Sequence, residues 1–324
     1  MYHLEMMQAP RESRFAMTTS QDSVRTGSET LESNVFDCAL AFEGGGYRGA
    51  YTAGMVTTLL EQGIYFDYVC GISAGASHTV NYLSRDIPRA AFAFMGIDGE
   101  EKLGGMGSFV RGKGYFNADY MYDGCLFDGC FPYDWETFAK NPARARFQAF
   151  ERDTGRSVVF GREDMTDVRR LFLLARASST IPVAMNPAPV DGRVFYDGGL
   201  GEGAGIPLRI AERDGFERAV LVATRPAGYR KKPLSTTARK VMQRLFGSYP
   251  HLLEAVLTRN ERYNDELDRV AGLEREGRVL VIRPDTMPVS NGTLDTVKLE
   301  RAYQLGRAQA RRELPRLRDY IGLA

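Results

Sequence analysis

Histidine is scarce in this sequence: His3, His78 and His251 are the three among 324 residues. Histidine is the usual proton acceptor for a catalytic serine, and in the common arrangement on an α/β sheet it follows a late strand. His3 lies in a polar N-terminal stretch, and no motif surrounds His251. His78 lies five residues after Ser73 on the helix predicted to follow it, where the helical period points it away from the serine. A serine nucleophile in this chain would therefore need another base, with His78 and His251 left open as weaker candidates.

Long apolar runs and an excess of charge are also missing. No uninterrupted apolar run reaches about 18 residues, which argues against a membrane-spanning helix. The 42 Lys and Arg against 41 Asp and Glu give a net charge of +1, so no global field favours nucleic acid. Residues 1–34 are polar and lack the apolar core of a secretory signal. We expect a flexible leader there and a cytoplasmic protein, with peripheral contact to the inner membrane left open.

Cysteine is the third scarce residue, with four in the chain. Cys38 and Cys70 fall in predicted core strands, where thiols behave as small apolar residues. Cys125 and Cys130 end two copies of Asp-Gly-Cys, a pattern compatible with a metal site. Because no second Cys or His pair lies nearby, turn-forming Asp-Gly steps explain this pattern better.

The most informative stretch is a G-x-S-x-G pattern formed by Gly71, Ser73 and Gly75. It follows a predicted buried strand at residues 65–70 and precedes a predicted helix at 76–83. In that setting the pattern makes a sharp strand-to-helix turn that exposes a serine hydroxyl, and the glycines leave room for the backbone to fold around it. Small residues are common, so the pattern alone is a weak indication of a nucleophile.

A glycine run follows the first predicted strand, residues 37–42, and precedes a predicted helix at 50–62. Gly44, Gly46 and Gly49 match the G-x-G-x-x-G fingerprint of dinucleotide-binding proteins, but the acidic residue expected at the tip of the next strand is absent. The alternative is an oxyanion hole, in which backbone N–H groups at a helix N-terminus bind developing negative charge. Two adjacent turns that open at one sheet edge, one with glycines and one with a serine, favour acyl transfer.

Asp197 is the candidate base. It follows a predicted strand at residues 193–196 and precedes Gly198 and Gly199, so its carboxylate can point into a site at the sheet edge. If this stretch is considered without the other motifs, an ordinary Asp-Gly turn explains it better than a catalytic role does. The shortage of histidine nevertheless leaves Asp197 as the residue to pair with Ser73 in a Ser-Asp dyad. A carboxylate is a weak base at neutral pH, and burial would strengthen it by raising its pKa.

The remaining pattern alternates strands and helices, which predicts an α/β protein with a mainly parallel sheet. Residues 84–161 are rich in glycine and aromatic side chains, which suits an insertion packed on the core, a lid or an apolar substrate wall. Helix 236–246 has apolar and basic residues that could touch an anionic membrane, although an ordinary surface helix explains it better. Further predicted elements are strands at 157–160, 218–224 and 278–283 and helices at 165–178, 204–214, 251–277 and 294–317.

Three motifs in this order resemble those of the patatin-like phospholipases, and the chain as a whole looks like the bacterial subgroup. They are Glu-Gly-Gly-Gly-Tyr-Arg-Gly at residues 43–49, Gly-Ile-Ser-Ala-Gly at 71–75 and Asp-Gly-Gly at 197–199. The intervening segments at 81–85 and 177–182 also resemble segments of that family. The resemblance covers roughly residues 37–225, and three ordered motifs are far more specific than any one of them.

The resemblance implies a three-layer α/β/α fold and hydrolysis of acyl esters of lipids through a Ser-Asp dyad, without a metal ion or an organic cofactor. Ser73 would be the nucleophile and Asp197 the proton acceptor. The implied site comprises an oxyanion hole at Gly44, Gly45, Gly46, Arg48 and Gly49, a nucleophile turn flanked by Gly71 and Gly75, and the Asp-Gly-Gly motif at Asp197, Gly198 and Gly199. Arg48 would steady the glycine loop or meet an anionic head group.

Two departures from the family pattern stand out. Glu43 replaces the aspartate that many members carry before the glycines, and residues 200–207 are richer in glycine than expected. We divide the chain into a leader at 1–34 and a patatin-like domain at 35–324, with the core motifs in 37–225 and a C-terminal α/β extension at 226–324. The predicted substrate is an acyl lipid or simple ester, and a non-catalytic lipid-binding or regulatory protein on the same fold is the alternative. The oligomeric state stays open.

Overall fold

Eight strands form the central sheet of the computed structural model, which describes residues 31–95, 104–124 and 132–323. Each strand pairs with the next in the series β5-β6-β3-β2-β1-β7-β8, and β4 also pairs with β3. Four pairings are parallel, namely β2 with β1, β1 with β7, β7 with β8 and β2 with β3. The strands are β1 (Ala39–Phe42), β2 (Tyr68–Ile72), β3 (Arg144–Glu151), β4 (Ser157–Phe160), β5 (Ala188–Val190), β6 (Arg193–Asp197), β7 (Ala219–Val222) and β8 (Val279–Ile282).

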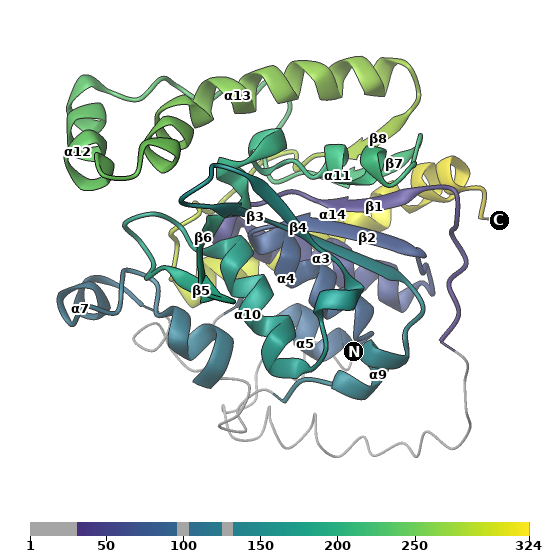
Figure 1. Cartoon of the computed structure of the whole chain (residues 1–324). Coiled ribbons are helices and arrows are strands. Elements are labelled where there is room, and N and C mark those ends of the chain that lie inside the picture. The colour runs from purple at the N-terminus through teal and green to yellow at the C-terminus, as the bar shows by residue number, and fades with distance from the viewer. Residues whose placement is uncertain (1–30, 96–103, 125–131, 324) are drawn as a thin grey trace. The chain divides into compact units, whose positions relative to one another are not determined.

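Helices cover both faces of this sheet (Figure 1). The side chains of β1 show why: Leu40 and Phe42 pack into one apolar cluster, and Ala39 and Ala41 pack into another. Alternate side chains of a strand point to opposite faces, so a strand that is apolar throughout must be covered on both sides. The predicted three-layer α/β/α fold with a mainly parallel sheet is therefore confirmed.

The first of these clusters lies under α3, α4, α10 and α14, and the second lies under α11 and α13. Short helices α5, α7 and α9 and the amphipathic helix α12 complete the described part of the chain, together with short 3₁₀ turns. The helices are α3 (Gly49–Glu61), α4 (Ala74–Leu83), α5 (Ile87–Phe92), α7 (Met106–Val110), α9 (Trp135–Lys140), α10 (Val168–Ser179), α11 (Leu208–Arg213), α12 (Thr236–Phe246), α13 (Pro250–Arg275) and α14 (Thr296–Ile321).

One predicted helix begins later than expected, and strand β3 was not predicted. The predicted helix at 204–214 begins only at Leu208, because the 3₁₀ turn Glu202–Gly205 ends with Gly205 at φ +114° and Pro207 precedes the helix. Strand β3 lies inside the 84–161 segment, where no strand was predicted before residue 157. Its alternating Ala145, Phe147 and Ala149 are the pattern that could have revealed it.

The C-terminal extension is built into this fold. Strand β8 adds an edge to the sheet beside β7, and α14 packs against α3. Gly306 permits the close approach of these two helices, since a Cβ atom there would lie 2.0 Å from the Tyr51 carbonyl oxygen. None of the helices in the described part of the chain combines the length and the apolar character that a membrane span requires. Most of the predicted leader, and Cys125 and Cys130, lie outside the described residues.

Candidate active site

The carboxyl ends of β2 and β6 meet beside β3. Strand β4 pairs with β3 along the stretch where β3 also contacts β2 and β6, so β2 and β6 share the opposite edge of β3. Strand β2 runs parallel to β3 and β6 runs antiparallel, so their carboxyl ends approach each other. Ile72 pairs with Gln148 and Asp197 pairs with the next residue, Ala149. This register brings Ser73, which follows Ile72, next to Asp197.

Ser73 sits on a sharp turn between β2 and α4. Its φ of +59° and ψ of −124° lie in a region that side-chain-bearing residues rarely adopt. The flanking glycines are needed because the backbone closes on itself: a Cβ atom on Gly71 would lie 2.1 Å from the Gly75 carbonyl oxygen. A Cβ atom on Gly75 would lie 2.0 Å from the Phe42 carbonyl oxygen. Ser73 is 6% exposed.

Two consecutive hydrogen bonds hold the backbone of this turn. The Ser73 N–H donates to the Ser178 hydroxyl at 2.9 Å, and that hydroxyl donates to the Gln148 carbonyl oxygen at 2.7 Å. Ser178 lies on α10 and Gln148 on β3, so two other elements fix the Ser73 backbone. Strain at one residue persists only when its surroundings hold it in this way.

The Asp197 carboxyl is buried beside the serine. Burial raises its pKa, while nearby Arg259, a hydrogen bond with the Ser73 side chain and the Gly199 N–H lower that pKa. The Gly199 N–H donates to Asp197 Oδ1 at 2.7 Å, which fixes the carboxyl plane. The side chain is 8% exposed. Its pKa is therefore higher than that of an ordinary aspartate, as a general base at neutral pH requires.

The glycine loop packs directly on Ser73, since a Cβ atom on Gly44 would lie 3.2 Å from Ser73 Cβ. Five residues of this loop are predicted to form an oxyanion hole, and the amides of three of them already have acceptors. The Gly44 N–H donates to the Gly205 carbonyl oxygen at 2.9 Å, the Arg48 N–H to Gly45 at 3.2 Å and the Gly49 N–H to Gly46. Within the described residues, the amides of Gly45 and Gly46 have no such acceptor.

Helix α13 holds the loop that follows Asp197. Arg259 Nε donates to the Gly199 carbonyl oxygen at 2.8 Å. Arg262 donates from its two terminal nitrogens to the carbonyl oxygens of Leu200 and Gly201, each at 2.7 Å. These arginines were missed by the sequence reasoning, which saw only a charged amphipathic helix there. Their contacts explain how the glycine-rich stretch after Asp197 keeps one conformation.

The histidines and the aromatic segment occupy other places. The His78 ring is buried and stacks on Phe94 with 4.3 Å between ring centroids, and burial lowers its pKa to about 3. His251 is exposed at the start of α13. Burial raises the pKa of Tyr122, from the 84–161 segment, and the negative charge of Asp197 raises that pKa further. One aromatic side chain of that segment therefore lies near Asp197.

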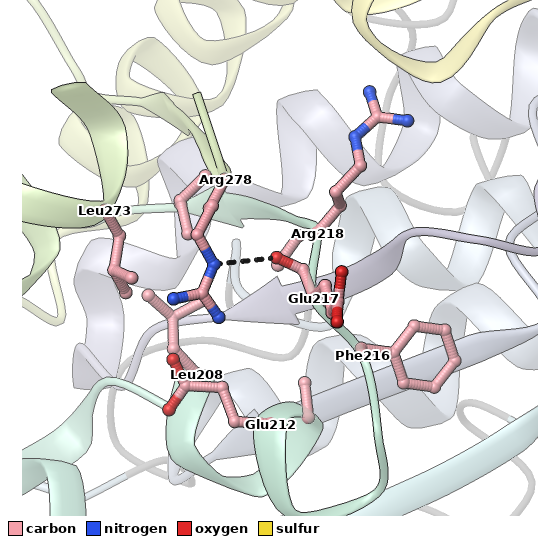
Figure 2. A pocket seen from close by; sticks show the side chains of 10 residues that line it. Leu208, Glu212, Phe216, Glu217, Arg218, Leu273 and Arg278 are labelled. Carbon is pink, nitrogen blue, oxygen red and sulfur yellow. Dashed lines mark hydrogen bonds between the residues drawn. The ribbon is translucent and has the colours of Figure 1, made fainter. Parts of the chain in front are cut away.

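A small pocket lies at the other end of the parallel strands (Figure 2). Its lining includes Ala219 and Val279, the first residues of β7 and β8, together with Arg278, whose Nε donates to the Glu217 carbonyl oxygen at 3.3 Å. Sites in open α/β sheets lie beyond the carboxyl ends of the strands. We therefore do not assign the substrate to this pocket.

Comparison with known proteins places the motifs within one family model. Residues 40–211 match the model described as patatin-like phospholipase, and residues 249–322 match a domain of unknown function (DUF6363). The uncharacterized protein YjjU of Escherichia coli (strain K12) is 26% identical over 200 residues, which cover 58% of this chain and 52% of YjjU. The chain thus spans about half the length of that curated relative. A crystal structure of VipD from Legionella pneumophila matches over 90% of this chain and 72% of VipD, with 14% identity and a TM-score of 0.47.

Proposed function

Because the chain belongs to the patatin-like phospholipase family, we propose that it is a serine hydrolase that cleaves acyl esters of lipids. The observation that carries this proposal is the meeting of β2 and β6 beside β3, which brings the Ser73 hydroxyl to the Asp197 carboxyl. The proposed nucleophile stands on a strained turn, and the proposed base is a buried carboxyl with a raised pKa. Both features suit acyl transfer.

In the proposed reaction, Ser73 Oγ attacks the ester carbonyl carbon while Asp197 accepts the hydroxyl proton. The carbonyl oxygen becomes an oxyanion, and the Gly45 and Gly46 N–H groups donate hydrogen bonds to it. The tetrahedral intermediate expels the alcohol, which takes the proton back from Asp197. The product of this half-reaction is an acyl ester on Ser73.

The second half-reaction repeats the same steps with water. Asp197 accepts a proton from water, and the resulting hydroxide attacks the acyl carbon. The intermediate then releases the fatty acid, and Asp197 returns the proton to Ser73 Oγ. Asp197 thus serves each half-reaction as base and then as acid, and the scheme uses only groups of this chain.

The proposal predicts that the purified protein hydrolyses acyl esters that are dissolved as single molecules. A panel of p-nitrophenyl esters and glycerolipids with acyl chains of increasing length should reveal hydrolysis, measured by release of chromophore or fatty acid. The alternative is a non-catalytic lipid-binding or regulatory protein on the same fold. Retained lipid binding without turnover of any ester in the panel would favour that alternative.

Peripheral membrane contact is part of the proposal, and helix α12 is the proposed contact. Val241 and Leu245 on this helix are 46% and 51% exposed, beside Arg239, Lys240 and Arg244. Apolar side chains framed by cations suit the surface of an anionic bilayer. We expect the chain to sediment with vesicles of phosphatidylglycerol and phosphatidylcholine.

The double substitution Val241→Ser and Leu245→Ser should lower the bound fraction several-fold, because each change removes about 1–3 kcal/mol of apolar transfer. The matched control is Val297→Ser with Leu305→Ser, which alters the same residue types exposed on α14. Equal binding by the α12 variant and the control would remove the proposed role of α12.

A further inference from the structure

One face of α13 contacts both loops of the proposed active site. Arg259, Arg262 and Tyr263 occupy positions i, i+3 and i+4 of this helix, which lie on the same side of a helix. The two arginines contact the loop that follows Asp197, and Tyr263 contacts Glu43, the residue before the glycine loop. Helix α13 belongs to the part of the chain that matches a domain of unknown function. Residues outside the patatin-like match therefore lie beside the reaction centre.

The backbone at residues 198–202 depends on side-chain donors. Its five consecutive carbonyl oxygens all accept hydrogen bonds from side chains, at 2.7–2.9 Å. Gln148 on β3 holds the first and the last of them, and Arg259 and Arg262 hold the three in between. Hydrogen bonds from a charged donor are stronger than those between neutral groups. The conformation of this loop is therefore set from α13 as well as from the sheet.

Arg259 contacts Asp197 through Gly199. The Gly199 N–H donates to Asp197 Oδ1 at 2.7 Å, and the Gly199 carbonyl oxygen accepts from Arg259 Nε at 2.8 Å. A Cβ atom on Gly199 would lie 2.8 Å from Asp197 Oδ1 and 2.8 Å from Arg259 Nη2, so the carboxyl and the guanidinium pack around this one glycine. A displacement of Arg259 would therefore move the peptide that orients the proposed base.

The same face of α13 holds the start of the glycine loop. The Tyr263 hydroxyl donates to Glu43 Oε1 at 2.6 Å, and both side chains are 2% exposed. Glu43 Oε2 accepts from the Thr224 N–H at 2.6 Å. This buried carboxylate therefore links the residue before the glycines to α13 and to the segment that follows β7.

The loop before α14 adds a contact to the glycine loop. The Asn291 carbonyl oxygen accepts from the Tyr47 N–H at 3.1 Å, and Tyr47 directly follows the proposed oxyanion donors Gly45 and Gly46. A Cβ atom on Gly46 would lie 2.5 Å from the same carbonyl oxygen, so the two backbones are in direct contact. Asn291 also lies within the match to the domain of unknown function. Two separate segments of that region thus hold the glycine loop.

Resting on the proposed function, we infer that the C-terminal region is part of the active site, and that Arg259, Arg262 and Tyr263 are positioning residues for the base and the oxyanion donors. Side chains on one rigid helix fix the distance between the two loops that they hold. The reaction depends on this distance, since a displacement of about 1 Å can lower a rate by about 10²-fold. The assigned role involves no contact with the substrate, so its loss should lower kcat and leave KM nearly unchanged.

The test uses the full chain and a p-nitrophenyl acyl ester, well below the melting temperature of each variant. Arg262→Met keeps the length of the side chain and removes its donors to the loop after Asp197. It should lower kcat by about 10²-fold, with KM within about threefold of the wild type. Arg262→Lys restores the charge but not the paired donors, so it should recover only part of the loss. Tyr263→Phe should lower kcat in the same direction through Glu43.

The matched control is Arg275→Met. Arg275 is an exposed arginine of the same helix, and its Nε donates to the Ala271 carbonyl oxygen within that helix at 3.2 Å. Its replacement should leave kcat and KM at their wild-type values. A lower melting temperature of Arg262→Met with a wild-type kcat would show that this arginine only stabilises the fold, and would overturn the inference.

Hydrogen exchange measures the positioning without turnover. Amides of residues 198–205 should exchange faster in Arg262→Met, and amides of residues 43–49 should exchange faster in Tyr263→Phe, than in the wild type or in Arg275→Met. Faster exchange together with a lower kcat supports the inference, and unchanged exchange in both loops overturns it. If the wild-type chain hydrolyses no ester, the proposed function fails, while the exchange still decides whether α13 holds the two loops.

Discussion

Replacing Ser73 with alanine is expected to lower kcat/KM for a p-nitrophenyl acyl ester by on the order of 10⁴-fold or more. The reason is that the substitution removes the attacking oxygen, and catalytic groups that act as one unit lose most of their effect when any one of them is removed. The protein should stay folded, because alanine meets the same backbone conformation as serine and the Ser73 N–H keeps its bond to Ser178. Steady-state kinetics and a thermal melt measure both expectations.

The control for this variant is Ser84→Ala at the other end of α4. The Ser84 hydroxyl donates to the Asn81 carbonyl oxygen within its own helix, so its loss should leave kcat/KM within a few-fold of the wild type. The melting temperature of Ser73→Ala should differ from that of the wild type by less than about 4 °C. Full activity in a folded Ser73→Ala protein would refute the proposed mechanism.

Replacing Asp197 with asparagine is expected to lower kcat by on the order of 10³-fold, within the range that general bases contribute. Asparagine keeps the size of the side chain and an oxygen for the Gly199 N–H, but it cannot take the serine proton. In the wild type kcat/KM should rise with pH as Asp197 loses its proton, since only the ionised carboxylate is a base. That acid limb should disappear from the residual activity of Asp197→Asn.

The same substitution should not weaken the fold. Burial raises the Asp197 pKa in the folded state, so the folded chain binds this proton more tightly than the unfolded chain does. The contribution of Asp197 to stability is therefore greatest below its unfolded pKa and is lost as pH rises through its folded pKa. Asparagine has no such loss, so at neutral pH Asp197→Asn should melt at the same temperature as the wild type or higher.

Asp153→Asn is the matched control, since this exposed carboxylate pairs with Arg152 and with no other cation among the described residues. Its activity and pH profile should follow the wild type. An Asp197→Asn variant with wild-type turnover and an unchanged acid limb would exclude Asp197 as the base. In that case, the buried carboxyl would need a purely structural explanation.

The layers of the fold could be predicted from the sequence because they depend on local patterns. Continuous apolar strands next to amphipathic helices require a sheet covered on both faces. The meeting of Ser73 with Asp197 depends on β3, a strand that the sequence reasoning missed. The Ala145, Phe147 and Ala149 alternation was present, with Arg144 and Arg146 at the polar positions, but it follows a long aromatic segment that suggested an insertion. The sequence therefore named the candidate site residues, but only the structure shows that Ser73 and Asp197 lie next to each other.

The hydrogen bonds of the glycine loop and the contacts of Arg259 depend on tertiary structure that no local pattern reveals. A run of glycines indicates free amides, but the Gly44 amide is used by Gly205, which lies 161 positions later in the chain. Arg259 looked like one member of a charged amphipathic helix. Its position near Asp197 depends on how α13 packs on the sheet, through buried residues such as Tyr263 and Val270.

Covalent labelling of the wild-type chain by a fluorophosphonate probe tests the central claim, that Ser73 is a nucleophile activated by Asp197. The probe reacts with activated serines and leaves an adduct that peptide mass spectrometry locates. We predict one adduct on the peptide that contains Ser73, much slower labelling in Asp197→Asn and no labelling of the unfolded chain. An active, folded preparation that carries no adduct on Ser73, or that carries it on another serine, would contradict the account.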